Sequence, residues 1–521
     1  MRATLRQSMA WLHAWSGLVV GWVLFAVFVT GTASYYRTAI SQWMRPELHA
    51  GVAVDVPNAA DRAVGALRER APEARAWFIT LPTPEMPATR IVWRLRPDVP
   101  FSVALLDPET GGPTPARDTR GGDFLYRFHY ELHMAPLWGR WIVGVCAMIM
   151  LIALVSGIVT HRRIFADLFT FRRDRSAQRG WLDAHNVAGV LALPYHLMIT
   201  YTGLVTLMLM YMPWGVDTAY NGHRDQYFAE RGQSIAARLS ANAPGELAPL
   251  APMIREATRM IGSEATFVAI HNPRDARSTV VVTLDEPQGI AHLHPAIGFD
   301  GISGAVLSTT TPAAPATTVH GTLLGLHEAH FAGPALRVLF FLSGLMGCAM
   351  VATGLVLWSV ARLPKPGEAL RIPFGHRLVH ALNVGTVAGL PIAIACYFLA
   401  NRLLPAAMPG RLDAEVQAFF GAWVLTAVPA LILPPRQSWR LVLTAASILW
   451  VATPIVGGLT TRRHLVASLM AGDATFVGFD LALSCIGLGF GFAAHRVGFL
   501  CGTKARAMTV SVPSHARAPA G

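Results

Sequence analysis

Long runs of apolar residues alternate with polar segments along this 521-residue chain. The first run, 11–36, contains no Asp, Glu, Lys or Arg, and it exceeds the roughly 20 residues that an α-helix needs to cross a bilayer. Comparable runs follow at about 141–160, 183–214, 338–360, 374–399, 416–433, 441–459 and 475–494. The pattern therefore predicts an all-α polytopic membrane protein with about eight transmembrane helices.

The two long polar segments between these runs each begin with a helical pattern and continue with strand-forming stretches rich in β-branched and aromatic residues. Helices are expected at 60–70 and 250–261, strands at 76–81, 90–95, 101–106, 266–270 and 279–284, and turns at 107–112 and 300–304. We therefore expect two small α+β modules outside the membrane.

The charge of the chain fits a membrane protein. Only 14% of the residues are charged, against about 25% in soluble domains, and the net charge is +12. Basic residues lie beside the apolar runs, at Arg2 and Arg6, at six arginines within 161–180, and at Arg362, Lys365 and Arg371. Because such residues remain on the cytoplasmic side, we expect both termini in the cytoplasm of a bacterial inner membrane and both modules in the periplasm. The partner implied by the charge is membrane lipid and no nucleic acid.

A unit of span, outer module and span occurs twice. His13 and the pair Thr30-Gly31 are seventeen residues apart, as are His185 and Thr202-Gly203, and Leu132-His133 precedes the second span as Leu326-His327 precedes the fourth. The resulting division is a helix at 8–36, a module at 37–128, helices 2 and 3 at 129–214, a second module at 215–325, helices 4 and 5 at 326–400, helices 6–8 at 401–497 and a tail at 498–521.

Histidine near or inside a span is the informative feature, because an imidazole in hydrocarbon is costly unless it is paired, hydrated or ligating. Nine histidines have this placement: His13, His185, His376 and His380 at the cytoplasmic ends, His129, His133, His327 and His330 on the outer side, and His196 within the third span. On a straight helix, His185 and His196 would share one face about 16 Å apart. This arrangement favours two b-type haems with axial imidazoles from facing helices. The pairings stay open, and a histidine site for another transition metal is the nearest rival.

The sequence gives little support for a nucleotide cofactor, a catalytic nucleophile or a thiolate metal site. No dinucleotide-binding, Walker, nucleophile-elbow or H-E-x-x-H pattern occurs in a suitable context, so no flavin or nicotinamide motif is expected in this chain. The five cysteines form no C-x-x-C pair, which argues against a thiolate metal site. His292-Leu-His294 is weak evidence for a surface metal site.

The opening Trp11-Leu-His13-Ala-Trp-Ser-Gly17-Leu-Val-Val-Gly21-Trp resembles that of the PepSY-associated transmembrane family. The Leu-His pairs before the second and fourth spans resemble its later spans, and the turn 107–112 resembles the closing strand of PepSY domains. The resemblance covers about 8–400. The second module departs from the pattern at 300–304, where it has Asp-Gly-Ile-Ser-Gly.

Members of that family include inner-membrane ferric-siderophore reductases. The resemblance implies an oxidoreductase with b-type haem that takes electrons from quinol or a separate donor and passes them to a periplasmic ferric siderophore or other iron complex. The ligands that it implies are His13, His133, His185, His196, His327 and His380. Two alternatives remain: a PepSY-type sensor or regulatory binding protein without redox activity, and a metal or haem transporter. Asp480 is the one acid that we expect well inside a span, whereas transporters more readily show paired acids and broken helices.

Overall fold

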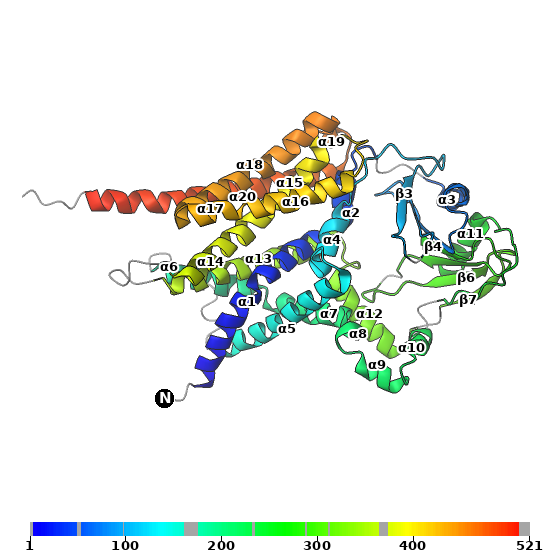
Figure 1. Ribbon diagram of the computed structural model, residues 1–521, viewed down its shortest axis with the longest axis horizontal. Coiled ribbons are helices and arrows are strands. Elements are labelled where there is room, and N and C mark those ends of the chain that lie inside the picture. The colour runs from blue at the N-terminus through cyan, green and yellow to red at the C-terminus, as the bar shows by residue number, and fades with distance from the viewer. Residues whose placement is uncertain are drawn as a thin grey trace, which may run out of the picture.

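The computed structural model describes residues 4–48, 54–96, 98–160, 176–231, 235–286, 289–310, 313–363 and 373–509. Figure 1 shows a long bundle of helices with a β-sheet and its covering helices at one end. The N-terminus and the last part of the final helix lie at the other end of the bundle. Most of the basic residues used above for orientation fall on 1–3, 161–175 and 364–372, outside the described residues. The end of the expected tail, 510–521, also lies outside them.

Within the described residues, seven helices are long and apolar enough to cross a membrane. They are α1 (Leu5–Ser34), α5 (Pro136–Thr160), α13 (Pro334–Ala361), the continuous α14 (Phe374–Asn383), η1 (Val384–Ala388) and α15 (Gly389–Leu403), the pair α16 (Arg411–Leu425) and α17 (Ala427–Ile432), α18 (Pro435–Thr461) and α20 (Ala474–Thr509). Each overlaps one of the apolar runs over most of its length. The chain is therefore a multi-pass membrane protein, as the pattern predicts.

The remaining apolar run, the third, is not one straight helix. It forms α6 (Ala177–Leu191) and α7 (Leu193–Thr206), which are bent by 67° at the break. Pro194 lies in the first turn of α7, where its missing N–H costs no helical hydrogen bond. The expectation that His185 and His196 share one face of a straight helix is therefore wrong. Counted as one broken span, the pair brings the number of candidate spans to eight.

Shorter helices connect the spans. They are α2 (Arg37–Trp43), α4 (Gly122–Glu131), α8 (Met208–Tyr211), α9 (Trp214–Ala219), α10 (Arg224–Glu230), α12 (Pro315–Glu328) and α19 (Leu465–Met470). Of these, α4 precedes α5 and α12 precedes α13, so each leads directly into a span.

Both polar segments fold in the expected order of helix and then strands, but they share a single sheet. The elements are α3 (Val56–Arg70), β1 (Ala76–Thr80), β2 (Thr89–Trp93) and β3 (Ser102–Leu106) from the first segment, and α11 (Leu250–Ile261), β4 (Ala265–His271), β5 (Thr279–Leu284), β6 (Ala296–Asp300) and β7 (Val306–Thr309) from the second. The strand order is β3-β2-β1-β4-β5-β6-β7, and every neighbouring pair is antiparallel. We call this unit the sheet domain.

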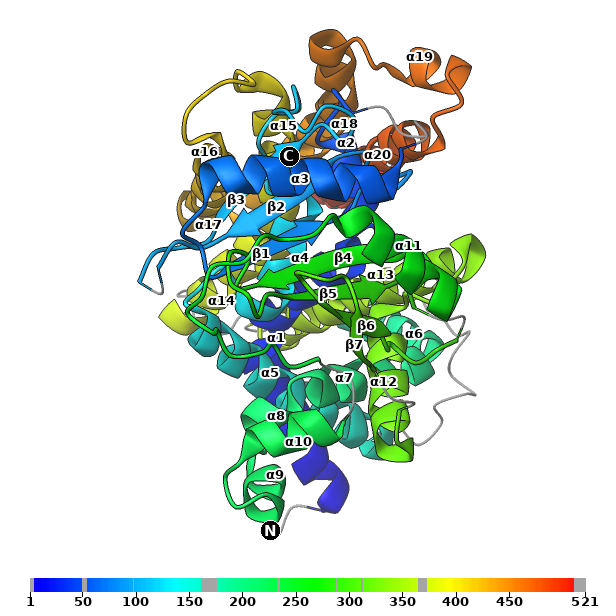
Figure 2. The same cartoon turned by 90° about the vertical axis from the view of Figure 1, so that its right-hand side faces the viewer.

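The two halves of the sheet domain join through β1 and β4, where Trp77 lies opposite Ile270. The helices α3 and α11 lie across one face of the sheet (Figure 2). Leu67 from α3 and Leu250 from α11 are fully buried there with Trp77. Because this core draws residues from both segments, neither segment has a complete core of its own.

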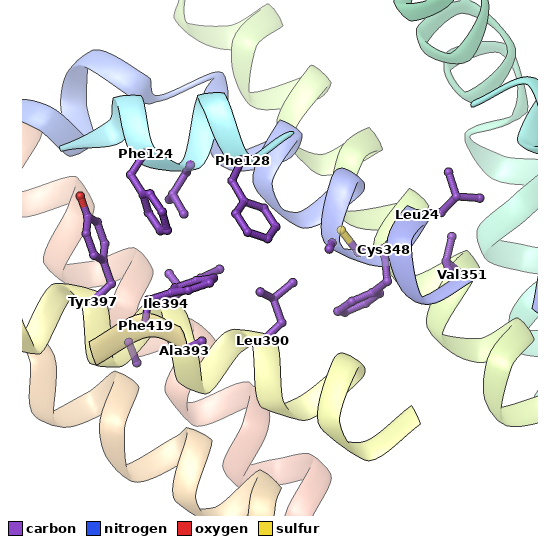
Figure 3. Close-up of a cluster of buried hydrophobic side chains, with 14 of the residues drawn as sticks. Leu24, Phe124, Phe128, Cys348, Val351, Leu390, Ala393, Ile394, Tyr397 and Phe419 are labelled. Carbon is purple, nitrogen blue, oxygen red and sulfur yellow. The ribbon is translucent and has the colours of Figure 1, made fainter. Parts of the chain in front are cut away.

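Figure 3 shows how α4 is held against the membrane bundle by aromatic side chains. The ring of Phe124 lies 4.9 Å from that of Tyr397 and 5.0 Å from that of Phe419, while Phe128 lies 5.6 Å from Phe419. The hydroxyl of Tyr397 donates to the carbonyl of Gly121 directly before α4. These contacts with α15 and α16 fix the position of α4 and of the histidine near its end.

The turn between β6 and β7 provides a test of the sheet domain. The carboxylate of Asp300 accepts hydrogen bonds from the N–H groups of Ile302 and Ser303, both at 2.9 Å, and pairs with Arg238 at 2.7 Å. The N–H of Ser303 and these other partners lower the pKa of Asp300 to about 2. Because folding lowers this carboxyl pKa, the ionised group stabilises the fold at pH values above its pKa in the unfolded chain. This contribution is lost as the pH falls towards 2.

We expect Asp300→Ala to destabilise the sheet domain by about 1 kcal/mol at pH 7, since solvent screens this partly exposed site. Thermal unfolding followed by circular dichroism at pH 7 and near pH 2 measures the effect. The difference from the wild type should be much smaller at the lower pH. Asp98→Ala serves as the control, because its side chain is 75% exposed and lies 3.8 Å from Arg96. Equal destabilisation by both variants would contradict this role.

Candidate functional site

Two histidines from different helices face each other at the end of the bundle away from the sheet domain. The ring centroids of His13 on α1 and His185 on α6 are 6.0 Å apart. The Nδ1 atom of His13 is 2.8 Å from the carbonyl oxygen of Ala153, and that of His185 is 2.8 Å from the carbonyl oxygen of Met350. Because a carbonyl oxygen only accepts, each Nδ1 carries the proton and each Nε2 keeps its lone pair. We call these residues the far-end pair.

A second pair lies towards the sheet domain. The ring centroids of His129 on α4 and His327 on α12 are 6.1 Å apart. Nδ1 of His129 is 2.8 Å from the carbonyl oxygen of Val27. Nδ1 of His327 is 3.1 Å from the hydroxyl oxygen of Thr202, which itself donates to the carbonyl of Met198. The hydroxyl therefore accepts from His327, and this sheet-side pair also presents Nε2 as the lone-pair nitrogen.

Glycines of the repeated motif lie against the sheet-side pair. A Cβ atom on Gly31 would be 2.6 Å from Cε1 of His129, and one on Gly203 would be 2.8 Å from Cε1 of His327. These are the glycines of the two Thr-Gly pairs that define the repeat. Only glycine leaves room for the imidazole against the helix backbone here, which explains why the motif occurs twice.

The far-end pair has the same relation to glycines of α5 and α13. A Cβ atom on Gly157 would be 3.2 Å from Cε1 of His13, and one on Gly354 would be 3.0 Å from Cε1 of His185. One helical turn beyond His13, the Cβ position of Gly17 has no atom within 4 Å. The helix face one turn from His13 is therefore uncovered at Gly17.

Both pairs fit a metal held by two imidazoles. Bonds from imidazole nitrogen to a metal are about 2 Å long, so rings on opposite sides of one ion have centres roughly 6 Å apart. The measured separations of 6.0 and 6.1 Å agree with this value. The hydrogen bond from each Nδ1–H fixes the orientation and tautomer that a ligating histidine needs. Apolar helices around the rings suit a haem macrocycle.

His196 on α7 is fully buried and does not face another of these histidines. Its ring lies 6.1 Å from that of Phe28 and 5.9 Å from that of Tyr195. The backbone groups of Gly189 and Ser343 lie near its nitrogens, but neither contact has the geometry of a hydrogen bond. The hydroxyl of Thr200 one turn later also has no hydrogen-bond partner among the described residues. Buried polar groups normally have partners, so His196 and Thr200 are available to a bound group.

His133 does not take the place that the repeat predicts for it. Its ring contacts those of Phe124 at 5.7 Å and Phe420 at 5.5 Å, and the residue facing His327 is His129. The two copies differ by one residue: the first reads His-Tyr-Glu-Leu-His and the second His-Glu-Ala-His. Aligning the His-Glu-His order across this insertion would have matched His129 with His327.

The remaining predicted ligands lie apart from the two pairs. The ring of His376 is 6.4 Å from that of Trp358, and its nitrogens have no hydrogen-bond partner among the described residues. Nε2 of His380 is 3.1 Å from the hydroxyl oxygen of Ser438. His330 hydrogen-bonds a carboxylate at the end of α12. Of the nine histidines singled out in the sequence, four thus form facing pairs.

Sequence similarity to known proteins gives the family of this chain. The model of the PepSY-associated TM region matches residues 10–361, which include both histidine pairs. The chain belongs to the PepSY-associated transmembrane family. In this chain further candidate spans follow the matched region, beginning with the one that contains α14. A Pseudomonas aeruginosa protein described only as uncharacterized is 26% identical over 404 residues, covering 70% of this chain and 92% of that protein.

Proposed function

We propose that this protein is an oxidoreductase with b-type haem that passes electrons across the membrane to a ferric complex, such as a ferric siderophore, on the side of the sheet domain. The observation that carries the proposal is the pair of facing imidazoles at each end of α1. His13 and Gly31, on which His129 packs, are eighteen residues apart on that helix, a rise of about 27 Å.

When bound, haem supplies one-electron chemistry through its iron. The far-end pair would hold one haem and the sheet-side pair the other. The residues of the chain hold each imidazole in one tautomer, orient it through the Nδ1–H bond and make Nε2 more basic. The apolar helices exclude water. His196 and Thr200 would offer buried polar groups to a bound haem.

The direction of transfer follows from the expected orientation. With the far-end pair on the cytoplasmic side, electrons would enter from quinol or from a separate cytoplasmic donor. Each ferric ion accepts one electron, and the ferrous product binds hard oxygen ligands more weakly. Reduction would therefore release iron from a siderophore at the periplasmic surface.

The test uses the purified protein in proteoliposomes with a reductant inside and a ferric siderophore with a ferrous chelator outside. We expect formation of the ferrous chelate with the wild type and a loss of at least tenfold with His185→Ala or His327→Ala. His223→Ala is the control, since this exposed histidine lies outside both pairs. Rates equal to those of protein-free vesicles, in protein that contains haem, would refute the proposal.

A transporter of iron, haem or another metal is the second candidate. The broken helix α6–α7, with the buried and unpartnered His196 just after the bend, favours it, because transporters often place sites at discontinuous helices. Uptake of labelled iron into vesicles without an internal reductant distinguishes the two. Uptake under these conditions supports transport, whereas chelate formation outside that requires an internal reductant supports electron transfer.

The glycine contacts provide a further prediction. Gly203→Val would place side-chain atoms where Cε1 of His327 now lies, so we expect it to displace this ring and remove about half of the bound haem. Haem content per chain measures the effect. Gly478→Val on α20 is the matched control, because its Cβ position has no atom within 4 Å. Full haem content in both variants would contradict the close contact.

A further inference from the structure

Five potential metal ligands gather at the surface of the sheet domain beside the sheet-side pair. Glu286, His292 and His294 belong to the segment between β5 and β6, while Glu328 and His330 lie at the end of α12. We call these residues the Glu-His cluster. The ring of His292 is central, because it lies 4.6 Å from that of His294 and 5.0 Å from that of His330.

Contacts between side chains join the two halves of the cluster. Nδ1 of His292 lies against Oε1 of Glu286, and its Nε2 is 3.8 Å from Oε2 of Glu328. Nε2 of His294 is 3.6 Å from Oε1 of Glu286, and Nε2 of His330 is 2.8 Å from Oε2 of Glu328. Each carboxylate thus faces two imidazoles.

Two glycines of α12 allow the β5–β6 segment to approach this helix closely. The N–H of His292 donates to the carbonyl of Gly321 at 2.9 Å. A Cβ atom on Gly325 would lie 1.7 Å from the carbonyl oxygen of Ile290. The backbone of the β5–β6 segment therefore lies directly on α12 where the helix has no side chains, and this contact brings His292 to Glu328.

We propose that the Glu-His cluster binds a divalent first-row transition-metal cation. Two overlapping sets of three, Glu286-His292-His294 and His292-Glu328-His330, each have their ligand atoms within 4.8 Å of one another. Ligand atoms around one ion with bonds of about 2.0–2.2 Å lie at most roughly 4.4 Å apart, so small side-chain rotations close either set. Mixed imidazole and carboxylate ligands suit Zn²⁺, Fe²⁺ or Mn²⁺, whereas Ca²⁺ and Mg²⁺ prefer oxygen alone.

The exposure of the cluster suits an ion that enters and leaves. The side chains of His294 and His330 are 41% and 56% exposed, while those of Glu286, His292 and Glu328 are 14–20% exposed. The cluster is thus closed towards the domain and open to solvent. Glu328 directly follows a histidine of the sheet-side pair in the chain. A role in holding the released ferrous ion rests on the proposed function, but the binding of metal does not.

The test is equilibrium dialysis of the full-length, haem-supplied protein in detergent against Zn²⁺, with bound metal counted by mass spectrometry. We expect the wild type to bind one more equivalent of Zn²⁺ than the double variant His292→Ala/His294→Ala, whose affinity should fall at least tenfold. His223→Ala should bind as the wild type does. Equal binding by the wild type and the double variant would overturn the proposal.

A second variant leaves all five ligands in place. Gly325→Val should push the β5–β6 segment off α12 and lower Zn²⁺ affinity at least tenfold, whereas Gly375→Val, at a position with no atom within 4 Å of its Cβ, should not. Unchanged affinity in Gly325→Val would contradict the assembly of the site across this contact. Haem content, measured on the same samples, reports on the proposed function separately: Zn²⁺ binding without haem would refute that function alone.

Discussion

Replacing His185 with alanine should remove one of two haems and leave the other, and replacing His327 should do the same for the opposite haem. Each histidine belongs to a different facing pair, with ring separations of 6.0 and 6.1 Å. Loss of an axial imidazole leaves a single ligand, too few for a stable six-coordinate b-type centre. We expect each single variant to keep about half of the haem absorbance per chain and the combined variant to lose nearly all of it.

Variants within one pair test whether both of its histidines hold the same haem. The double variant His129→Ala/His327→Ala should lose no more haem than His327→Ala alone, because both residues serve one centre. His133→Ala and His376→Ala should keep their haem, since the structure places these residues outside the pairs. Haem quantified as the pyridine complex measures all of them. Greater loss in His133→Ala than in His129→Ala would contradict the assignment.

Removing the buried cation Arg411 should destabilise the protein by about 3–5 kcal/mol, because a buried carboxylate would lose its partner. Arg411 and Glu415 on α16 form an ion pair and are 1% and 0% exposed. Glu415 also accepts from the hydroxyl of Thr119 at 2.6 Å and from the amide of Asn401 at 2.9 Å. The pair thus ties the segment before α4 to the later spans.

Thermal unfolding in detergent, followed by intrinsic fluorescence, measures this effect. Arg411→Met alone should lower the midpoint clearly, whereas Arg411→Met/Glu415→Leu should recover most of the loss, because it removes both charges. Asp413→Ala is the control, since its side chain is 70% exposed on the same helix. A double variant as unstable as the single one would contradict the buried-charge argument.

The spans could be predicted from the sequence because a long uncharged apolar run has few alternatives to a membrane helix. The bend between α6 and α7 could not be predicted from hydropathy, because Pro194 and its neighbours are apolar and continue the run. Glu415 was also missed as an acid within a span, since the apolar run begins only after it.

The repeat in the sequence identified His13 and His185 as equivalent, but it did not reveal that equivalent residues face each other. That relation depends on how the two copies pack. The insertion of Tyr130 shifted the apparent match to His133, although His129 faces His327. The sequence therefore identified three of the four facing histidines as family ligands and included His129 only among the candidates.

Contacts between segments that are distant in the sequence could not be predicted from local sequence patterns. The pairing of β1 with β4 joins residues almost two hundred positions apart, so two modules were expected where one sheet forms. The same limit applies to the Glu-His cluster, in which His292-Leu-His294 gains meaning only through its contact with Glu328 on α12.

Electron transfer through this protein requires that the two histidine pairs hold haem. The most direct measurement is the reduced-minus-oxidised absorption spectrum of the purified wild-type protein, made with ample haem supply, together with the ratio of haem to protein. We expect the bands of b-type haem and two haems per chain. A spectrum without haem bands in folded protein would contradict it.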